Sequence, residues 1–156
     1  MNKTIEYYEK NASKFVEGTV GVEFTGIQDR FLECLPRKSR VLDFGCGSGR
    51  DTKYFLEKGY QVDAMDGSLE LCKLASEYAG VQVEHKLFQE LDAQEYYDGI
   101  WACSSILHLD KAALEDVFRL MVRALKSEGV LYTSFKYGIF RVKGMAGFLL
   151  TLLRSL

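Results

Sequence analysis

The sequence predicts an α/β fold in which a doubly wound, mostly parallel sheet lies between two layers of helices. Short apolar runs typical of strands alternate with segments of helical periodicity along most of the 156 residues. The first of these runs, at 41–44, breaks into a series of glycines and then enters a helix. Strands and helices alternating in this way favour right-handed crossovers, with any ligand bound beyond the carboxyl ends of the strands. The length suits one domain with a core of its own.

Each expected element has its own signal. Residues 2–18 are polar with interleaved aromatic side chains on one helical face, and a second helix over 22–35 stops at Pro36, which cannot continue it. Gly59 is placed to close a helix over 51–58, and Ser68 is placed to cap the next helix. The remaining expected elements are strands at 41–44, 60–64, 81–88, 99–104 and 129–135, and a helix over 110–126.

The glycine segment carries the most specific signal for function. Gly45, Gly47 and Gly49 stand at alternate positions, so a ligand could approach the backbone where a Cβ would block it, and the following helix N-terminus offers N–H donors. The third glycine comes one residue earlier than in a dinucleotide fingerprint. Asp43 would also repel a pyrophosphate, whereas a ligand with an ammonium or sulfonium group would remove that conflict. We expect loop N–H groups or the ligand ammonium to satisfy this carboxylate.

Residues 40–68, RVLDFGCGSGRDTKYFLEKGYQVDAMDGS, resemble the first strand, glycine loop, first helix and second strand of class I S-adenosylmethionine-dependent methyltransferases. Segments 88–92, 97–103 and 107–108 resemble the bacterial small-molecule branch of that family, whose best-known members are of the tellurite-resistance type. The resemblance covers roughly the first 138 residues. It implies a Rossmann-like three-layer fold, S-adenosyl-L-methionine as the cofactor and a small molecule as the methyl acceptor.

The resemblance also implies a set of cofactor-binding residues. They are Asp43, Gly45, Cys46, Gly47 and Gly49 for the methionine part, Asp66 and Gly67 at the ribose, Phe88 and Gln89 at the adenine, Ser104 beside the sulfonium and Tyr8 as an aromatic lid. Other interpretations stay open, with Asp66 as a cap for the next helix and Tyr8 as core packing. Arg50 and Asp51 either contact the ligand or form a solvated helical turn. His108 is a weak candidate for a catalytic residue, since an imidazole accepts a proton at neutral pH.

Composition and charge argue against several classes of protein. A net charge of −2 gives no basic field for nucleic acid. The apolar run at 148–153 is far shorter than the about 20 residues that cross a bilayer, so no membrane span is expected. Four cysteines without paired spacing and an N-terminus without an apolar signal core indicate a cytoplasmic, reduced protein. His85 has no partner at ligand spacing, so no metal site is expected.

The resemblance ends near Gly138. Residues 1–138 are interpreted as an incomplete methyltransferase domain and 139–156 as an apolar tail outside the family pattern, so the last strands of the seven-stranded family sheet are expected to be missing. One back-translation of this tail, read out of phase, resembles the family's closing segment. We therefore hypothesise a frameshift near 137–139 that leaves the cofactor half intact and impairs the acceptor half.

The missing strands predict self-association. Without a neighbour, the fifth strand would expose a free edge that invites pairing with another chain, and a helical tail would present one apolar stripe to a partner. The edge residues are Leu131, Thr133 and Phe135, and the stripe consists of Phe148, Leu149, Leu152 and Leu153. A homodimer or a larger aggregate is the expected result.

Two other functions are open on the sequence. A nicotinamide-dependent oxidoreductase is disfavoured by the glycine spacing and by Asp43. A non-catalytic ligand-binding or interaction module would keep the pocket without the transfer reaction. An oxidoreductase would bind NAD, whereas a non-catalytic module would show no methyl transfer.

Overall fold

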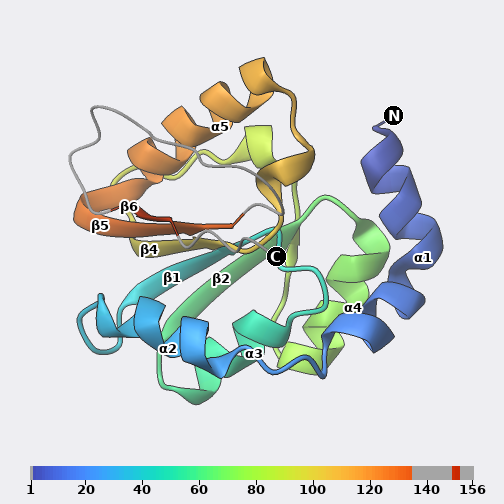
Figure 1. Ribbon diagram of the computed structural model, residues 1–156, viewed down its shortest axis with the longest axis horizontal. Helices are drawn as coiled ribbons and strands as arrows, with labels where there is room; N and C mark the ends of the chain where they lie inside the picture. The colour runs from blue at the N-terminus through green and yellow to red at the C-terminus, as the bar shows by residue number, and fades with distance from the viewer. Residues whose placement is uncertain (1, 135–148, 152–156) are drawn as a thin grey trace.

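A computed structural model describes residues 2–134 and 149–151. It confirms the predicted class, a parallel sheet between two layers of helices, with the strand order β3-β2-β1-β4-β5-β6 (Figure 1). The strands are β1 (Arg40–Phe44), β2 (Gln61–Asp66), β3 (Glu84–His85), β4 (Tyr97–Ala102), β5 (Leu125–Thr133) and β6 (Leu149–Thr151). The helices are α1 (Lys3–Thr19), α2 (Thr25–Glu33), α3 (Arg50–Glu57), α4 (Leu69–Ala79) and α5 (Lys111–Ala124), with short 3-10 helices η1 (Phe88–Glu90) and η2 (Ile106–His108).

The helices divide between the two faces of the sheet. In Figure 1, α5 lies on one face of β4 and β5, whereas α2 and α3 lie on the opposite face and α1 packs beside α4. Because every described strand pair is parallel, the carboxyl ends of the strands meet along one edge of the sheet. The glycine loop after β1 opens at this edge.

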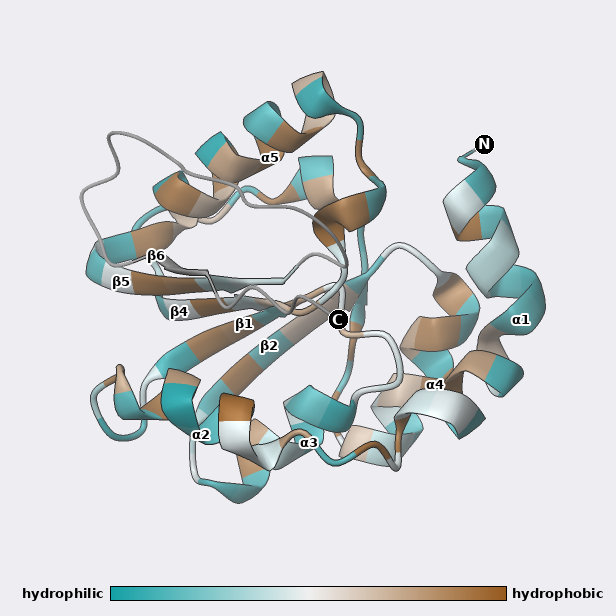
Figure 2. Ribbon diagram, in the orientation of Figure 1, coloured by the Kyte–Doolittle hydropathy of each residue, from teal (hydrophilic) through white to brown (hydrophobic). Residues whose placement is uncertain are grey.

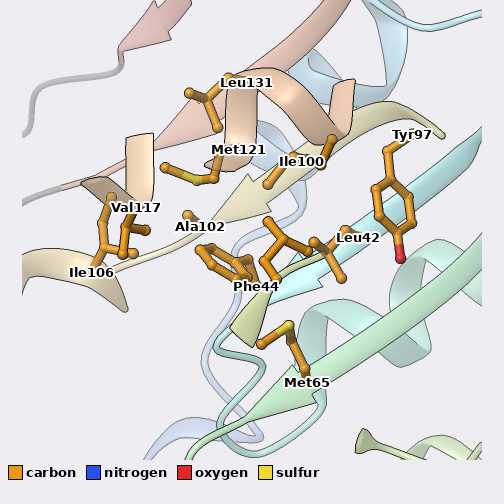
Figure 3. Packing of buried hydrophobic residues seen from close by; sticks show 12 residues of the cluster. Leu42, Phe44, Met65, Tyr97, Ile100, Ala102, Ile106, Val117, Met121 and Leu131 are labelled. Carbon is orange, nitrogen blue, oxygen red and sulfur yellow. The ribbon is translucent and has the colours of Figure 1, made fainter. Parts of the chain in front are cut away.

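The central strands read as continuous apolar runs because they are buried on both faces. In β1, Val41 packs with Trp101 in the core under α2 and α3, whereas Leu42 and Phe44 belong to the core under α5. Figure 3 shows the second of these cores, where side chains from β1 and β4 meet Met121 of α5. The same strands carry much of the apolar colour in Figure 2, whereas polar and apolar residues alternate along the helices.

Several element boundaries differ from the predicted ones. The third strand is only Glu84–His85, because Glu90 accepts a hydrogen bond from the backbone N–H of Leu87 at 2.6 Å and turns 88–90 into η1. β4 ends at Ala102, before Ser104, which adopts a left-handed φ of 50°. Helix α5 gives way to β5 at Leu125, four residues earlier than expected, and an irregularity in the β4 pairing absorbs the extra residues. The second helix is shorter than predicted, at Thr25–Glu33.

The expectation of a free fifth-strand edge is wrong at Leu131 and Thr133. Residues 149–151 form β6, which pairs in parallel with β5 from Leu131 to Thr133. The backbone groups that would have invited another chain are therefore paired within the molecule over this stretch. Leu149 is in a strand, which contradicts the helical stripe proposed for it. Phe135, Phe148, Leu152 and Leu153, the boundary at 138 and the proposed frameshift position lie outside the described residues.

Candidate functional site

A cavity of about 550 Å³ opens at the carboxyl edge of the sheet. This volume is within the range of small-molecule and cofactor sites. Its walls come from the glycine loop, the end of β2, η1, the segment after β4, and α1. The predicted site residues that line it are Tyr8, Gly45, Cys46, Gly47, Asp66, Gly67, Phe88, Gln89, Ser104 and His108. Asp43 and Gly49 are not among the lining residues.

The glycine loop is shaped by close packing at its first glycine. Gly45 has a φ of +79°, and a Cβ built there would lie 2.5 Å from the Cβ of Ser105 and 3.1 Å from the ring of Phe88. The N–H groups of Gly45 and Cys46 both donate to the carbonyl of Met65, at 2.9 and 3.0 Å, which ties the loop to β2. The first glycine is thus required by the packing of the loop itself.

The other two loop glycines have different neighbours. A Cβ on Gly47 would lie 3.0 Å from the ring of Phe15, so this position faces α1. Gly49 is the N-cap of α3, with a φ of +81°, and a Cβ there would lie 3.1 Å from Ala75 of α4. Gly49 therefore permits close packing of helices behind the loop, while Gly45 and Gly47 face the cavity.

Asp66 ends β2 and holds the base of the loop. One carboxylate oxygen accepts the N–H of Gly47 and the other accepts the N–H of Ser68, both at 2.9 Å. Burial raises the pKa of Asp66, and the two backbone hydrogen bonds oppose that rise. The cap of α4 is the Ser68 hydroxyl, which accepts the N–H of Leu71 at 3.2 Å. Each Asp66 oxygen keeps a second lone pair for a ligand hydroxyl.

Asp43 lies buried under the loop with a partner that the sequence did not indicate. Its carboxylate accepts the Thr52 hydroxyl at 2.6 Å, from the first turn of α3, whereas we expected loop N–H groups or a ligand ammonium. Burial raises its pKa well above the usual range, and the nearby charge of Asp51 adds to the rise. Thr52 was within reach because α3 starts directly after the loop and turns this hydroxyl back toward β1.

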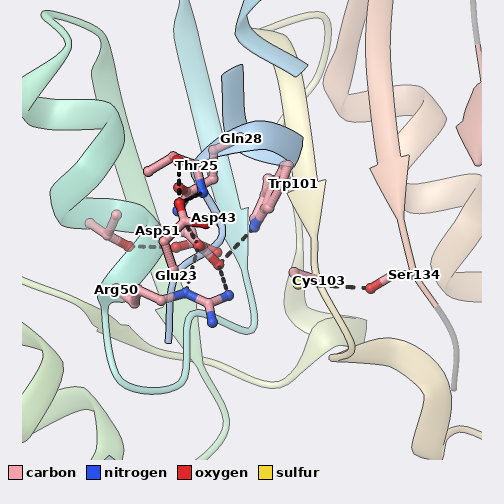
Figure 4. A network of polar contacts seen from close by, with 10 residues as sticks. Glu23, Thr25, Gln28, Asp43, Arg50, Asp51, Trp101, Cys103 and Ser134 are labelled. Atoms are coloured by element: carbon pink, nitrogen blue, oxygen red, sulfur yellow. Dashed lines mark hydrogen bonds and ion pairs between the residues drawn. The ribbon is translucent and has the colours of Figure 1, made fainter. Parts of the chain in front are cut away.

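Asp51 is the most connected polar side chain near the cavity (Figure 4). It is 6% exposed and accepts hydrogen bonds from Gln28 at 2.6 Å and from the indole N–H of Trp101 at 2.9 Å. Arg50 donates to both of its carboxylate oxygens, at 3.0 and 3.2 Å. The Arg50 guanidinium also lies 4.8 Å from the ring of Phe24. A solvated helical turn is therefore the wrong interpretation of this pair.

Phe88, Ser104 and Cys46 contribute aromatic and polar groups to the cavity wall. Phe88 packs against Phe44 with ring centroids 4.7 Å apart, so its position is set by β1. The backbone N–H of Ser104 donates to the Ser134 hydroxyl at 2.8 Å, which links the ends of β4 and β5. Cys46 is buried, and burial raises the pKa of its thiol well above the usual range, so it is not a thiolate nucleophile.

Tyr8 of α1 and His108 of η2 both line the cavity and contact each other. The Tyr8 hydroxyl lies 3.4 Å from Nε2 of His108, and their rings make an edge contact. Burial and the charge of Asp66 raise the pKa of the Tyr8 hydroxyl, which keeps it protonated. His85, at the edge strand, lies 3.0 Å from the carbonyl of Gly67. Among the described residues, no group of three or more His, Cys, Asp and Glu is arranged to hold a metal ion.

A parallel sheet with a glycine loop after β1 and a carboxylate at the end of β2 defines an α/β domain built to bind a nucleoside-containing ligand. Residues 41–129 match a family model described as a methyltransferase domain, and the chain belongs to that family, the class I S-adenosylmethionine-dependent methyltransferases.

Named relatives and solved structures agree with this family. A Bacillus subtilis protein whose name assigns it to the methyltransferases is 32% identical over 65% of this chain and 46% of its own length. A ubiquinone biosynthesis O-methyltransferase of Xanthomonas axonopodis is 31% identical over 64% of this chain and 44% of its own. The 1,6-didemethyltoxoflavin-N1-methyltransferase of Burkholderia thailandensis, solved with S-adenosylhomocysteine, superposes with a TM-score of 0.64 at 25% identity, covering 81% of this chain and 56% of that one.

The chain spans about half the length of most of the curated relatives it matches. Among residues 2–134 and 149–151, no helix combines the length and the apolar character needed to cross a membrane.

Proposed function

We propose that this chain binds S-adenosyl-L-methionine in the cavity and serves the transfer of its methyl group to a small molecule. The observation that carries the proposal is the cavity at the carboxyl edge of the sheet, which is lined by Gly45 and Gly47 of the glycine loop and by Asp66, the acceptor of the Gly47 N–H. Relatives named as O-methyltransferases and a similar structure solved with S-adenosylhomocysteine support it.

The cavity fits the parts of this cofactor. Asp66, with two free lone pairs, would accept the ribose hydroxyls, and Gly67 lies beside it. Phe88 offers a flat apolar face for the adenine, and Gln89 offers an amide. The methionine part would lie along the glycine loop, with Cys46 and Ser104 near the sulfonium. Asp43 and Gly49 would act from behind the loop, by supporting its shape.

The chain's own contribution to methyl transfer is positioning. The cofactor supplies a methyl group already activated by its sulfonium charge, so little acid–base chemistry is needed. The cavity walls hold donor and acceptor in line and exclude water, which lowers the entropic part of the barrier. His108, in the cavity wall beside Tyr8, is the candidate to accept a proton from the methyl acceptor.

Calorimetry with two ligands tests the proposed cofactor. We expect S-adenosylhomocysteine to bind with one site per chain and NAD to give no binding heat at the same concentrations. The physical reason is that the Asp66 carboxylate in the cavity wall favours a ligand without phosphate over one with a pyrophosphate. Binding of NAD alone would overturn the proposal in favour of an oxidoreductase.

A methyl-transfer assay over candidate small acceptors addresses the second half of the proposal. We propose that the acceptor half is incomplete in this cytoplasmic chain, because the sequence departs from the tellurite-resistance-like pattern after residue 138. The expected outcome is cofactor binding with weak turnover. Robust turnover would contradict the proposed impairment of catalysis. The frameshift hypothesis is tested by sequencing the gene. It fails if the codons for the tail do not encode a family-like segment in another reading frame.

Replacing Asp66 with Ala is expected to weaken S-adenosylhomocysteine binding by about 1.5 to 3 kcal/mol, the usual range for hydrogen bonds to a charged group. The loss combines missing ribose contacts with a loop that no longer has its anchor at Gly47. Isothermal titration measures the dissociation constant. Asp92→Ala is the control, since that side chain is 87% exposed and lies outside the cavity. An unchanged dissociation constant for Asp66→Ala would remove Asp66 from the site.

A further inference from the structure

Helix α1 forms part of the cavity wall although little of it is buried. Ala12 is its only buried residue, and Tyr7 is 60% exposed. Ile5, Tyr8 and Phe15 nevertheless line the cavity. An element with so few buried apolar contacts opens easily unless other interactions fix it. The position of this wall therefore depends on a small number of contacts.

Glu9 provides the principal polar contact of α1 with α4. Its Oε1 accepts the Ser68 hydroxyl at 2.8 Å and the backbone N–H of Glu70 at 3.2 Å. The N-terminus of α4 offers unpaired N–H groups and a positive dipole end, which favour a carboxylate. Burial would raise the pKa of Glu9, but the hydrogen bonds from Ser68 and Glu70 outweigh it and lower the pKa. The ionised form is the one held at this helix end.

The same contact connects α1 to the segment that carries Asp66. Ser68 donates its hydroxyl proton to Glu9, accepts the N–H of Leu71, and donates its own N–H to Asp66. Glu9 thus reaches the base of the glycine loop through a single intervening residue. A shift of the Glu9 carboxylate would therefore move both α1 and the segment that carries Asp66.

The first half of α1 makes contacts of its own with the rest of the molecule. Asn11 departs from helical geometry, with φ −118° and ψ 16°, and separates residues 3–10 from the half that carries Phe15. Within the first half, Ile5 packs over Gly67 and Tyr8 meets His108 at 3.4 Å. Glu9 is the charged contact that holds these two side chains over the cavity.

We propose that Glu9 is a positioning residue, which fixes the first half of α1 against the N-terminus of α4 and so sets the affinity of the cavity for its cofactor. This inference rests on the proposed function for the identity of the ligand. The anchoring itself is a property of the free protein.

The test compares Glu9→Ala, Glu9→Gln and the control Glu17→Ala. Both hydrogen bonds end on one Glu9 oxygen, so the amide oxygen of Gln can replace it, whereas Ala cannot. Glu17 is an exposed carboxylate in the second half of the same helix. Hydrogen exchange is followed over residues 3–10 without ligand, and S-adenosylhomocysteine binding is measured by calorimetry.

Glu9→Ala should speed exchange over residues 3–10 by about tenfold, leave β1 and β4 unchanged, and weaken ligand binding by about 5- to 30-fold. Glu9→Gln should recover most of both effects, and Glu17→Ala should show neither. Unchanged exchange in Glu9→Ala, or equal effects in Glu17→Ala, would overturn the anchoring. Faster exchange with unchanged affinity would overturn the link to the ligand. If the unsubstituted protein binds no S-adenosylhomocysteine, the proposed function fails, while the exchange result still decides the anchoring.

Discussion

Replacing Asp51 with Ala is expected to lower the free energy of unfolding by about 3 to 5 kcal/mol, the range for removing one partner of a buried ion pair. Three side chains lose their acceptor at once, namely Gln28, Arg50 and Trp101. Trp101 is fully buried, so its indole N–H loses the acceptor that satisfies it in the folded protein. Urea unfolding followed by circular dichroism measures the change as a shift of the midpoint at constant slope.

Two further variants make this result specific. Asp116→Ala removes an exposed carboxylate that pairs with Arg119 on the surface of α5, and it should change stability by less than about 0.5 kcal/mol. Asp51→Asn keeps the side-chain shape and one acceptor oxygen, so its loss should lie between the two. A fall of under about 1 kcal/mol for Asp51→Ala would contradict the network as a source of stability.

The Asp51 network also shows where sequence reasoning stops. The alternation of strands and helices, the glycine loop and the carboxylate of Asp66 are local patterns, so they predict both the fold and the edge of the sheet that holds the cavity. Gln28 and Trp101 stand 23 and 50 residues from Asp51. Their meeting depends on how α2 packs on β4, which no local period encodes. The sequence alone therefore did not decide whether Asp51 belongs to a solvated helical turn or contacts a ligand.

The sheet edges were the least predictable elements for a related reason. β3 has two exposed residues, so burial does not fix its length, and the Glu90 side chain decides where the extended chain turns. At the other edge, Leu149–Thr151 pair with β5 although the tail carries no family pattern. The central strands, buried on both faces, were predicted within a few residues because burial imposes their apolar runs.

For side-chain partners at the site too, local contacts were predicted and contacts that depend on tertiary packing were missed. Tyr8 and His108 lie 100 residues apart in sequence, and their contact depends on how α1 packs along the cavity. The Ser68 cap was predicted and is present, because a helix cap involves only neighbouring residues. The partner of Asp43 was missed, since the choice between loop N–H groups and the Thr52 hydroxyl depends on the exact path of the loop.

Replacing Gly45 with Ala is expected to weaken S-adenosylhomocysteine binding strongly and to destabilise the fold. The added Cβ would stand 2.5 Å from the Cβ of Ser105, a distance that neither residue can relieve by rotating a side chain. The φ of +79° adds strain of about 1 kcal/mol or more for any residue with a Cβ. Either the loop or the segment after β4 must move, and both line the cavity. Calorimetry should show affinity lowered by at least about 100-fold, or about 2.7 kcal/mol.

Gly80→Ala separates the two causes. Gly80 has a similar φ of +74° at the end of α4, but a Cβ there would meet nothing within 4 Å. This variant should therefore lose only the conformational part, about 1 kcal/mol of stability, and bind ligand as the unsubstituted protein does. The excess loss in Gly45→Ala then measures the steric requirement at the glycine loop. Equal stabilities and affinities for the two variants would show that backbone strain alone, and not close approach, requires glycine at position 45.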